Sequence, residues 1–497
     1  MYKTSVLEQK YKVCQLEDLM ARLEGYSAED RRRILTAYAF ANHNHKNQLR
    51  ESGDRYITHP LSVACILLDL GSDTETVMAG LLHDTVEDCD IPIEVIKEQF
   101  GPIVADLVDG VTKFRKEKGE NKEERIAKNL QKTVSSLVQD IRIIIIKLAD
   151  RLHNMITLDS KPSVTKAQET LEIFAPLAYL LGEYEIKCAL EDLSFKYVYP
   201  DEYNRLLQLK SAYEKEMESL MDETQLFAFM LFNNNGIDCN MSLESKHLYG
   251  LRRRLLEISE HYTAEDIHKI HDYNALNIYL KEKKDCRKAF DILKRDGHTI
   301  EGKDRDYLTT PKSNRYMGLH STILIPGAPN DDMLQFQFKT RDMEKINNHG
   351  ITAYWKIARK HNVDKNKLQD VVRNMQFYKQ LLELQDENLP AKEYMDELKH
   401  DIFTKMIYIF DDRTKPGSKS LIEMPNGSTP IDYAYRTRPT IANRIEKAYI
   451  NGEEKPLDYK LNSQDHVKII YGKDLHEKEE LIDKSYASKT RRLILKK

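Results

Sequence analysis

Hydrophobic residues recur every three to four positions through about the first 200 residues, which is the spacing of one face of an α-helix. The spacing is clearest over residues 61–70, 76–88 and 141–155. The third run contains the β-branched series Ile143 to Ile146, which would also suit a buried strand, but its long periodic context favours a core helix. The polar residues 115–128 indicate a surface loop or a frayed helix start. We therefore expect an all-α domain over residues 1–195 and a helical connector over residues 196–224.

The pattern changes near residue 225, where short runs rich in β-branched and aromatic residues alternate with helical stretches. The clearest runs are residues 274–280, 320–326 and 333–339. They predict an α+β domain over residues 225–375, followed by a charged helical linker over 376–403. Residues 404–473 contain two further strand-like runs, 406–410 and 466–470, and a turn at Pro425-Asn426-Gly427, which is typical of a small β-grasp module. The last segment, residues 474–497, is a basic tail that we expect to be solvated and disordered.

Composition and charge exclude several functional classes. The chain carries 76 basic and 80 acidic side chains with a formal net charge of −4, so it cannot bind polyanions through bulk charge. No run of about 18 apolar residues is present to span a membrane, and the polar N-terminus does not resemble a signal peptide. The 6 cysteines lie far apart and form no CxxC pair, which indicates reduced thiols and neither a disulfide framework nor a zinc site. We expect a cytoplasmic protein that does not contact a membrane.

Histidine and aspartate residues of the first domain suggest a metal site. His59 directly precedes Pro60, where a helix can begin, and His83 is followed by Asp84. Asp150 lies on an otherwise apolar helix face, where an isolated carboxylate would be costly, so it must be paired or bound to a metal. Together these imidazoles and carboxylates suit a divalent cation of intermediate hardness, above all Mn²⁺. Each residue alone also has a structural interpretation, as a capping histidine, a hydrogen-bonded buried aspartate or one partner of an ion pair at a helix end.

The longest motifs of this domain resemble the hydrolase half of the RelA/SpoT homologues, long alarmone enzymes with an HD-type phosphohydrolase domain. They are residues 50–67, 80–91, 108–114, 146–158 and 172–182. The separations, 24 residues from His59 to His83 and 66 from Asp84 to Asp150, also match the family. The resemblance therefore implies an HD-type ppGpp hydrolase domain over residues 1–195.

The resemblance also assigns roles to individual residues of this domain. It implies a Mn²⁺ ion held by His59, His83, Asp84 and Asp150. Glu87 and Asp88 would orient and deprotonate the attacking water, because a carboxylate can remove a proton from a water that a metal has acidified. The substrate-binding positions are Arg50, Ser52, Asn154 and Thr157. Glu51 departs from the family, which has a basic residue there, and this carboxylate should weaken polyphosphate binding unless it turns away or pairs with Arg55.

Residues 225–375 resemble the ppGpp synthetase domain of the same family. The resemblance makes Asp272 the Mg²⁺-binding aspartate and Tyr316 the tyrosine that stacks on guanine. Gln335, however, stands where the family has its catalytic carboxylate, and an amide is no base and a weak ligand for Mg²⁺. Two further departures are Glu244 and Asn277, which replace family arginines. We expect this domain to be inactive in synthesis, as a scaffold for the hydrolase or as a sensor that still binds a guanine nucleotide.

Residues 406–472 resemble the TGS domain, a β-grasp module. Arg438 replaces the histidine that contacts the tRNA end in ribosome-dependent family members, so the specific readout of tRNA is lost. The chain ends soon after this module, and we expect no ribosome or tRNA binding in this form.

The resemblance implies hydrolysis of the 3′-pyrophosphate of (p)ppGpp to GDP or GTP and pyrophosphate, with Mn²⁺ as cofactor, in stringent-response alarmone turnover. Two alternatives remain open. One is a bifunctional (p)ppGpp synthetase/hydrolase, and the other is a non-catalytic guanine-nucleotide or alarmone sensor that acts through the TGS module.

Overall fold

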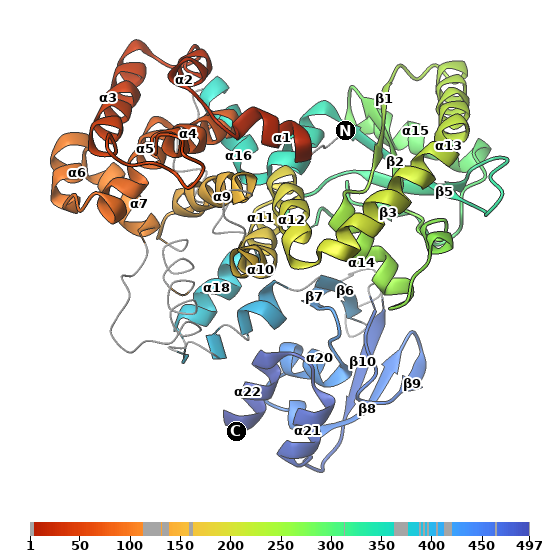
Figure 1. The fold of residues 1–497 in the computed structure, drawn as a ribbon. Coiled ribbons are helices and arrows are strands. Elements are labelled where there is room, and N and C mark those ends of the chain that lie inside the picture. Colours follow the sequence, from red (N-terminus) through yellow and green to blue (C-terminus); the bar gives the residue numbers. More distant parts are fainter. Residues whose placement is uncertain are drawn as a thin grey trace. The chain divides into compact units, whose positions relative to one another are not determined.

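The structure is a computed structural model, and Figure 1 shows its ribbon. It describes residues 4–112, 131, 139–158, 163–312, 314–361, 376–386, 389–390, 393–394, 397–403, 406–411, 420–462 and 465–496. The chain forms two compact units that divide near residue 380. The first unit holds a helical domain and an α+β domain, and the second holds a small β-sheet domain. The fold class predicted from the sequence is therefore confirmed.

All named elements of the N-terminal domain are helices in the part of it that the structure describes. Its elements are α1 (Thr4–Tyr11), α2 (Leu16–Arg22), α3 (Ala28–Asn44), α4 (Thr58–Leu70), α5 (Thr74–Asp88), α6 (Ile93–Phe100), α7 (Pro102–Val111), α9 (Ile141–Ile156), α10 (Val164–Glu169), η2 (Thr170–Phe174), α11 (Ala175–Leu180) and α12 (Tyr184–Val198). Ile143 to Ile146 are buried within α9, so their helical interpretation is confirmed. The predicted polar loop over residues 115–128 lies outside the described residues.

Local sequence explains how α4 and α5 are arranged as a helical hairpin. Gly71 ends α4 in the left-handed conformation at φ 83°, and the Asp73 side chain accepts a hydrogen bond from Thr76 N to begin α5. The two helices then pack closely, because a Cβ on Gly80 would lie only 2.4 Å from Leu67 Cδ1. This close packing brings the first turn of α4 near the last turns of α5, where the candidate ligands lie.

The second domain of the first unit contains a five-stranded sheet covered by helices. Its elements are α13 (Pro200–Asn234), β1 (Asn240–Ser245), α14 (Leu248–Ile258), η3 (Ala264–Ile267), β2 (Asn274–Leu280), α15 (Lys283–Asp296), β3 (Arg305–Asp306), β4 (Leu319–Leu324), β5 (Met333–Thr340) and α16 (Arg341–His361). The strand order is β1-β2-β5-β4-β3, with β2 and β5 parallel and the other neighbours antiparallel. The three strand-like runs of this region thus correspond to β2, β4 and β5.

Helix α16 joins this sheet to the helical domain. It bends at Gly350, whose φ of 41° and ψ of −117° are non-helical, and it packs against α4 and α12. Beyond the bend, Ile351 N donates to Leu181 O at 3.1 Å and Thr352 N donates to Glu183 Oε1 at 3.1 Å. The helix that follows β5 therefore lies against the helix that carries His59.

The second unit contains a mixed sheet with helices at its C-terminal end. Its elements are η4 (Leu398–Ile402), β6 (Met406–Asp411), β7 (Ser420–Pro425), α20 (Pro430–Thr437), η5 (Ala442–Arg444), β8 (Ile445–Ile450), β9 (Glu453–Lys455), β10 (His466–Tyr471), α21 (Lys478–Lys484) and α22 (Ser488–Lys496), while α18 (Gln376–Asp386) crosses the boundary between the units. The strand order is β7-β6-β10-β8-β9, with β6 and β10 parallel. The predicted runs 406–410 and 466–470 are β6 and β10.

The expectation of a disordered basic tail is wrong. Residues Ser488–Lys496 form α22, which buries Ile494 to 1% exposure against the core of the small domain. The Asp401 carboxylate accepts hydrogen bonds from Ser488 N at 2.9 Å and Lys489 N at 2.7 Å, which satisfies the first amides of the helix. Among the described residues, no helix combines the length and apolarity needed to cross a membrane.

Candidate metal centre

Two histidines present their Nε2 atoms to one site between α4, α5 and α9. His83 Nδ1 lies 2.8 Å from Gly80 O, so this nitrogen carries the proton and the Nε2 lone pair faces the site. His59 Nδ1 lies 2.7 Å from His153 Nδ1 on α9, which likewise orients His59 Nε2 towards the site. The centroids of the His59 and His83 rings are 5.3 Å apart, and both side chains are buried. Their orientations suit ligation of an ion through Nε2.

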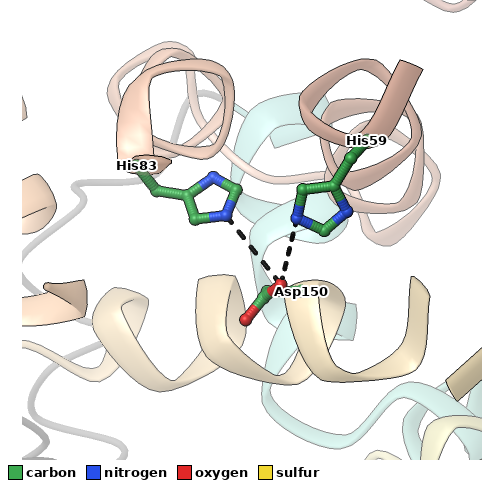
Figure 2. A group of neighbouring side chains, drawn as sticks. All are labelled: His59, His83 and Asp150. Atoms are coloured by element: carbon green, nitrogen blue, oxygen red, sulfur yellow. Dashed lines mark ion pairs between the residues drawn. The ribbon is translucent and has the colours of Figure 1, made fainter. Parts of the chain in front are cut away.

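Asp150 supplies the third group from α9. Its Oδ1 lies 3.2 Å from His59 Nε2 and 3.9 Å from His83 Nε2, and Figure 2 shows both rings pointing to this carboxylate. One ligand atom from each of the three side chains lies within 4.8 Å of the others. Asn154, one turn further along α9, donates to Asp150 Oδ1 at 2.5 Å and holds the carboxylate in place. These three residues therefore form a histidine and aspartate metal site.

Asp84, the fourth predicted ligand, lies beside the same histidines. Its Oδ1 is 3.1 Å from His83 Nε2 and its Oδ2 is 3.5 Å from His59 Nε2. Burial lowers the pKa of His59, which favours its neutral, ligating form. Burial alone would raise the pKa of Asp84, but the neighbouring His83 and His59 outweigh it and lower that pKa. A neutral imidazole beside an ionised carboxylate fits a divalent cation bound through nitrogen and oxygen.

Tyr56 is a site residue that the sequence analysis did not single out. Its hydroxyl oxygen lies 2.8 Å from Asp84 Oδ2 and 2.6 Å from Asp88 Oδ2, so it donates a hydrogen bond between these two carboxylates. The His45 ring stacks on the tyrosine with centroids 4.6 Å apart and an interplanar angle of 19°. Tyr56 lies three residues before His59, but its partners on α5 are far away in sequence, so no local pattern indicates the contact.

The two predicted catalytic carboxylates follow the ligands along α5. Asp88 is connected to Asp84 through the Tyr56 hydroxyl. Glu87 is exposed and lies four residues after His83, which places it on the same face of the helix. Both carboxylates are therefore exposed within about one turn of the ligands on α5, and Asp88 is also connected to the site through Tyr56.

Three of the four predicted substrate-binding residues border this site. Arg50 Nη2 donates to Thr157 Oγ1 at 3.1 Å, and the Arg50 guanidinium lies 5.7 Å from the centre of the Tyr56 ring. Asn154 contacts Asp150 directly. Ser52 instead donates to Asp54 Oδ2 at 2.7 Å within an exposed loop, a contact that does not connect it to the metal site.

In the second domain, the predicted Mg²⁺-binding aspartate is paired with cations. Asp272 Oδ2 lies 3.1 Å from Lys246 Nζ and 2.6 Å from Arg254 Nη2. Burial alone would raise the pKa of Asp272, but these two cations outweigh it and hold the pKa well below its ordinary value. The side chains of this domain thus neutralise the aspartate themselves.

The other two predicted residues of this domain belong to one hydrogen-bonded group, with Gln335 on β5 and Tyr316 in the segment before β4. Gln335 Oε1 accepts a hydrogen bond from Gln337 Nε2 at 2.8 Å. The Tyr316 hydroxyl contacts His320 Nε2 at 2.7 Å and Gln337 Oε1 at 3.2 Å. The amide of Gln335 is therefore part of a neutral polar network.

Three family models match successive parts of the chain. Residues 37–183 match the HD domain, residues 244–362 match the region found in RelA and SpoT proteins, and residues 414–471 match the TGS domain. The fold and the metal site therefore define a multidomain protein with a metal-binding HD domain, a synthetase-type domain and a TGS domain. The chain belongs to the RelA/SpoT family, as the sequence analysis predicted.

Curated relatives match most of this chain. A probable guanosine-3′,5′-bis(diphosphate) 3′-pyrophosphohydrolase from Synechocystis is 36% identical over 450 residues, covering 89% of this chain and 57% of the relative. A GTP pyrophosphokinase from Myxococcus xanthus is 35% identical over 449 residues, which cover 89% of this chain and 57% of the relative. The bifunctional (p)ppGpp synthase/hydrolase SpoT from Escherichia coli is 34% identical over 459 residues, which cover 91% of this chain and 63% of the relative. The chain thus spans between 57% and 63% of the length of these relatives.

Proposed function

We propose that the protein is a hydrolase that removes the 3′-pyrophosphate of (p)ppGpp, giving GDP or GTP and pyrophosphate, with Mn²⁺ as its cofactor. The observation that carries this proposal is the convergence of His59, His83, Asp84 and Asp150. When bound, the cation would lower the pKa of a water and offset negative charge on the phosphate oxygens. The names of the Synechocystis and E. coli relatives support this substrate class.

The other side chains around the metal site have separate roles in proton transfer and in substrate binding. Glu87 and Asp88 accept the proton of the attacking water, since both lie on the solvent side of α5 next to the ligands. Arg50 binds the substrate phosphates, because its guanidinium lies at the border of the site and its planar set of donors suits phosphate oxygens. Asn154 on α9 and Thr157 at the C-terminal end of the same helix complete the nucleotide pocket.

The proposal is tested by incubating the purified protein with ppGpp and Mn²⁺ and separating the products. We expect GDP and pyrophosphate in equal amounts. Asp84→Ala and Glu87→Ala should abolish breakdown, while Asp106→Ala, an exposed aspartate on α7, should leave it unchanged. Circular dichroism of each variant controls for folding. Intact ppGpp after incubation of the wild-type protein with Mn²⁺ would overturn the proposal.

We further propose that the synthetase-type domain does not make (p)ppGpp and serves as a scaffold for the hydrolase. Two features support this: Lys246 and Arg254 occupy the Asp272 carboxylate, and Gln335 provides an amide where a base is needed. Incubation with ATP, GDP and Mg²⁺ should therefore yield no ppGpp. A ppGpp product would establish the bifunctional alternative. That alternative is supported by the name of the E. coli relative, a bifunctional (p)ppGpp synthase/hydrolase.

The sensor alternative predicts a different outcome of the same pair of assays. Tyr316 retains the aromatic ring that would stack on guanine, although its hydroxyl is bonded to His320 and Gln337. Nucleotide binding without turnover in the Mn²⁺ assay would favour a sensor over a hydrolase.

A further inference from the structure

The two histidines of the metal site differ in the group that orients each ring. His83 Nδ1 faces the backbone oxygen of Gly80 at 2.8 Å. A carbonyl oxygen only accepts hydrogen bonds, so it fixes the proton on His83 Nδ1 by itself. His59 Nδ1 instead faces another imidazole nitrogen, His153 Nδ1, at 2.7 Å. Because a neutral imidazole nitrogen either donates or accepts, the contact between these two histidines allows two arrangements of their ring protons.

Only one of these arrangements allows His59 to bind a cation through Nε2. In it, His59 carries its proton on Nδ1 and donates to His153 Nδ1, which leaves the Nε2 lone pair of His59 facing the site. In the other, His153 is the donor, His59 carries its proton on Nε2, and Asp150 Oδ1 accepts that proton at 3.2 Å. Without a bound cation, the Asp150 carboxylate thus favours the arrangement in which His59 Nε2 is not a ligand.

The backbone oxygen of Lys12 favours the ligating arrangement from the far side of His153. His153 Nε2 lies 3.4 Å from this oxygen, which is a long hydrogen bond. When His153 accepts at Nδ1, its own proton is on Nε2 and is donated to Lys12 O. In the other arrangement, the Nε2 lone pair of His153 would face the lone pairs of the carbonyl. Because His153 is only 1% exposed, solvent does not compensate for the loss of this hydrogen bond.

Helix α4 holds the Lys12 carbonyl in place. Lys12 directly follows α1, and Cys14 N, two residues later, donates to Ser62 Oγ at 3.1 Å. Tyr11, the residue before Lys12, donates from its hydroxyl to Asp69 Oδ2 at 2.9 Å. Ser62 and Asp69 both belong to α4, the helix whose first turn carries one of the two histidine ligands. The segment around Lys12 is therefore attached on both sides to the helix that its carbonyl serves.

We propose that His153 is a positioning residue of the metal site and that the Lys12 carbonyl, acting through it, raises the affinity for the cation. The hydrogen bonds run from His59 Nδ1 to His153 Nδ1 and from His153 Nε2 to Lys12 O. A ligating histidine is better oriented and more basic when its second nitrogen donates to a fixed acceptor. The cation affinity then depends on a backbone group outside residues 37–183, the part that matches the HD domain. This inference rests on the cation binding of the proposed function and adds to it the groups that fix the His59 ring.

The Mn²⁺ affinity of the full chain tests the role of His153, measured without turnover from the electron paramagnetic resonance signal of free Mn²⁺. His153→Leu fills a similar volume but has no acceptor, so it should raise the dissociation constant about ten- to a hundredfold. His153→Asn is smaller, but its side-chain oxygen takes the place of Nδ1 and accepts from His59. It should therefore stay within about threefold of wild type.

A residue that only filled space would give the opposite order of affinities, with His153→Leu close to wild type and His153→Asn impaired. Thermal unfolding of the metal-free variants separates the two effects. We expect His153→Asn to be the less stable of the two, because it leaves a cavity in the core, and yet to bind Mn²⁺ more tightly.

Ser62→Ala tests the Lys12 end without changing either histidine. It removes the acceptor of Cys14 N and releases the Lys12 carbonyl, so it should raise the Mn²⁺ dissociation constant about fivefold, the effect of one hydrogen bond. In the His153→Asn background the same change should have no effect, because the shorter amide does not reach Lys12 O.

Three results would overturn this inference alone: equal Mn²⁺ affinity of wild type and His153→Leu, tighter binding by His153→Leu than by His153→Asn, or a Ser62→Ala effect of the same size in both backgrounds. An unchanged affinity of Ser62→Ala would also overturn it, by removing the role of Lys12. A wild-type protein that binds no Mn²⁺ would overturn this inference together with the proposed cofactor.

Discussion

At the scale of single residues, Tyr56 shows how a side chain outside the ligand set can control it. Its hydroxyl lies within hydrogen-bonding distance of Asp84 and Asp88, a proposed ligand and a proposed base. Without this donor, two nearby carboxylates would repel each other and change their orientation. The ring itself is fixed by its stacking on His45, so the hydroxyl and the ring have separable roles.

Tyr56→Phe should therefore lower kcat for ppGpp hydrolysis about ten- to a hundredfold, the effect of losing a hydrogen bond to a charged group, with KM nearly unchanged. The matched control is Tyr26→Phe, which removes a hydroxyl that donates to Ser72 O at 2.6 Å in the same domain. Steady-state kinetics with Mn²⁺ and thermal unfolding separate the two effects. The control should lose stability but keep kcat, and equal kcat losses in both variants would contradict the assigned role.

The metal site allows a prediction that does not depend on turnover. Mn²⁺ at about 100 times its dissociation constant should raise the free energy of unfolding by about 2.7 kcal/mol, because it binds the folded protein only. EDTA should reverse this effect. Asp150→Asn should abolish most of the stabilisation, since an amide is a weaker ligand than a carboxylate, while Asp106→Asn on α7 should retain it. Equal Mn²⁺ stabilisation of both variants in a thermal shift assay would exclude Asp150 as a ligand.

At the scale of elements, α16 depends on one glycine. Gly350 adopts a φ of 41° where the helix passes the end of α11, and a Cβ there would lie 2.1 Å from Leu181 O and 2.5 Å from Gly182 C. Both neighbours are backbone atoms, which cannot move aside as a side-chain end can. The contact between α16 and the helical domain therefore requires a residue without a side chain at this position.

Gly350→Ala should lower the free energy of unfolding by about 2–4 kcal/mol, through the clash and the left-handed backbone together. Gly302→Ala is the control, because that glycine has a φ of 77° but open space around its Cβ position. This variant should lower the free energy of unfolding by only about 1 kcal/mol, which is the effect of the left-handed conformation alone. Urea unfolding measures both values, and similar losses would show that the close approach of Gly350 is not tight in solution.

At the scale of the whole first unit, a buried polar group joins the two domains. His247, just before α14, lies 2.5 Å from Glu191 Oε2 and 3.4 Å from Cys188 Sγ, both on α12. Lys187 of the same helix also pairs with Glu191 at 2.6 Å. Burial alone would lower the pKa of His247, but Cys188 and Asp192 raise it to about 9. The junction is therefore held by a histidine that is protonated at neutral pH.

This shift predicts how stability depends on pH. Because the pKa of folded His247 lies above the ordinary value of 6.5, its stabilising effect is complete below pH 6.5 and is lost as pH rises through about 9. His247→Gln should remove this part of the pH dependence. His261→Gln, at an exposed histidine, should leave it unchanged. Urea unfolding between these pH values checks the prediction, and identical pH profiles for wild type and His247→Gln would contradict it.

The sequence alone was sufficient to predict the helical, α+β and β-grasp order of the chain, its family and the ligand types. Helical and strand periodicity are local, and β2 over Asn274–Leu280 matches the predicted run because its alternation lies within one segment. The residues His59, His83, Asp84 and Asp150 could be proposed together because the family resemblance links separate motifs. The structure then places them at one site.

The tertiary structure decided what depends on contacts between distant segments. Three features depend on which elements pack together: the Tyr56 bridge, the cations on Asp272 and the contact of His153 with Lys12. The hydrophobic periodicity of the sequence does not indicate how elements pack. The C-terminal helix is the clearest case. Its basic sequence suits a solvated tail, but burial of Ile494 and the hydrogen bonds to Asp401 stabilise it, and both require a surface formed by other parts of the chain. Local propensity is weak compared with burial, so a segment of this kind is ordered only by its neighbours.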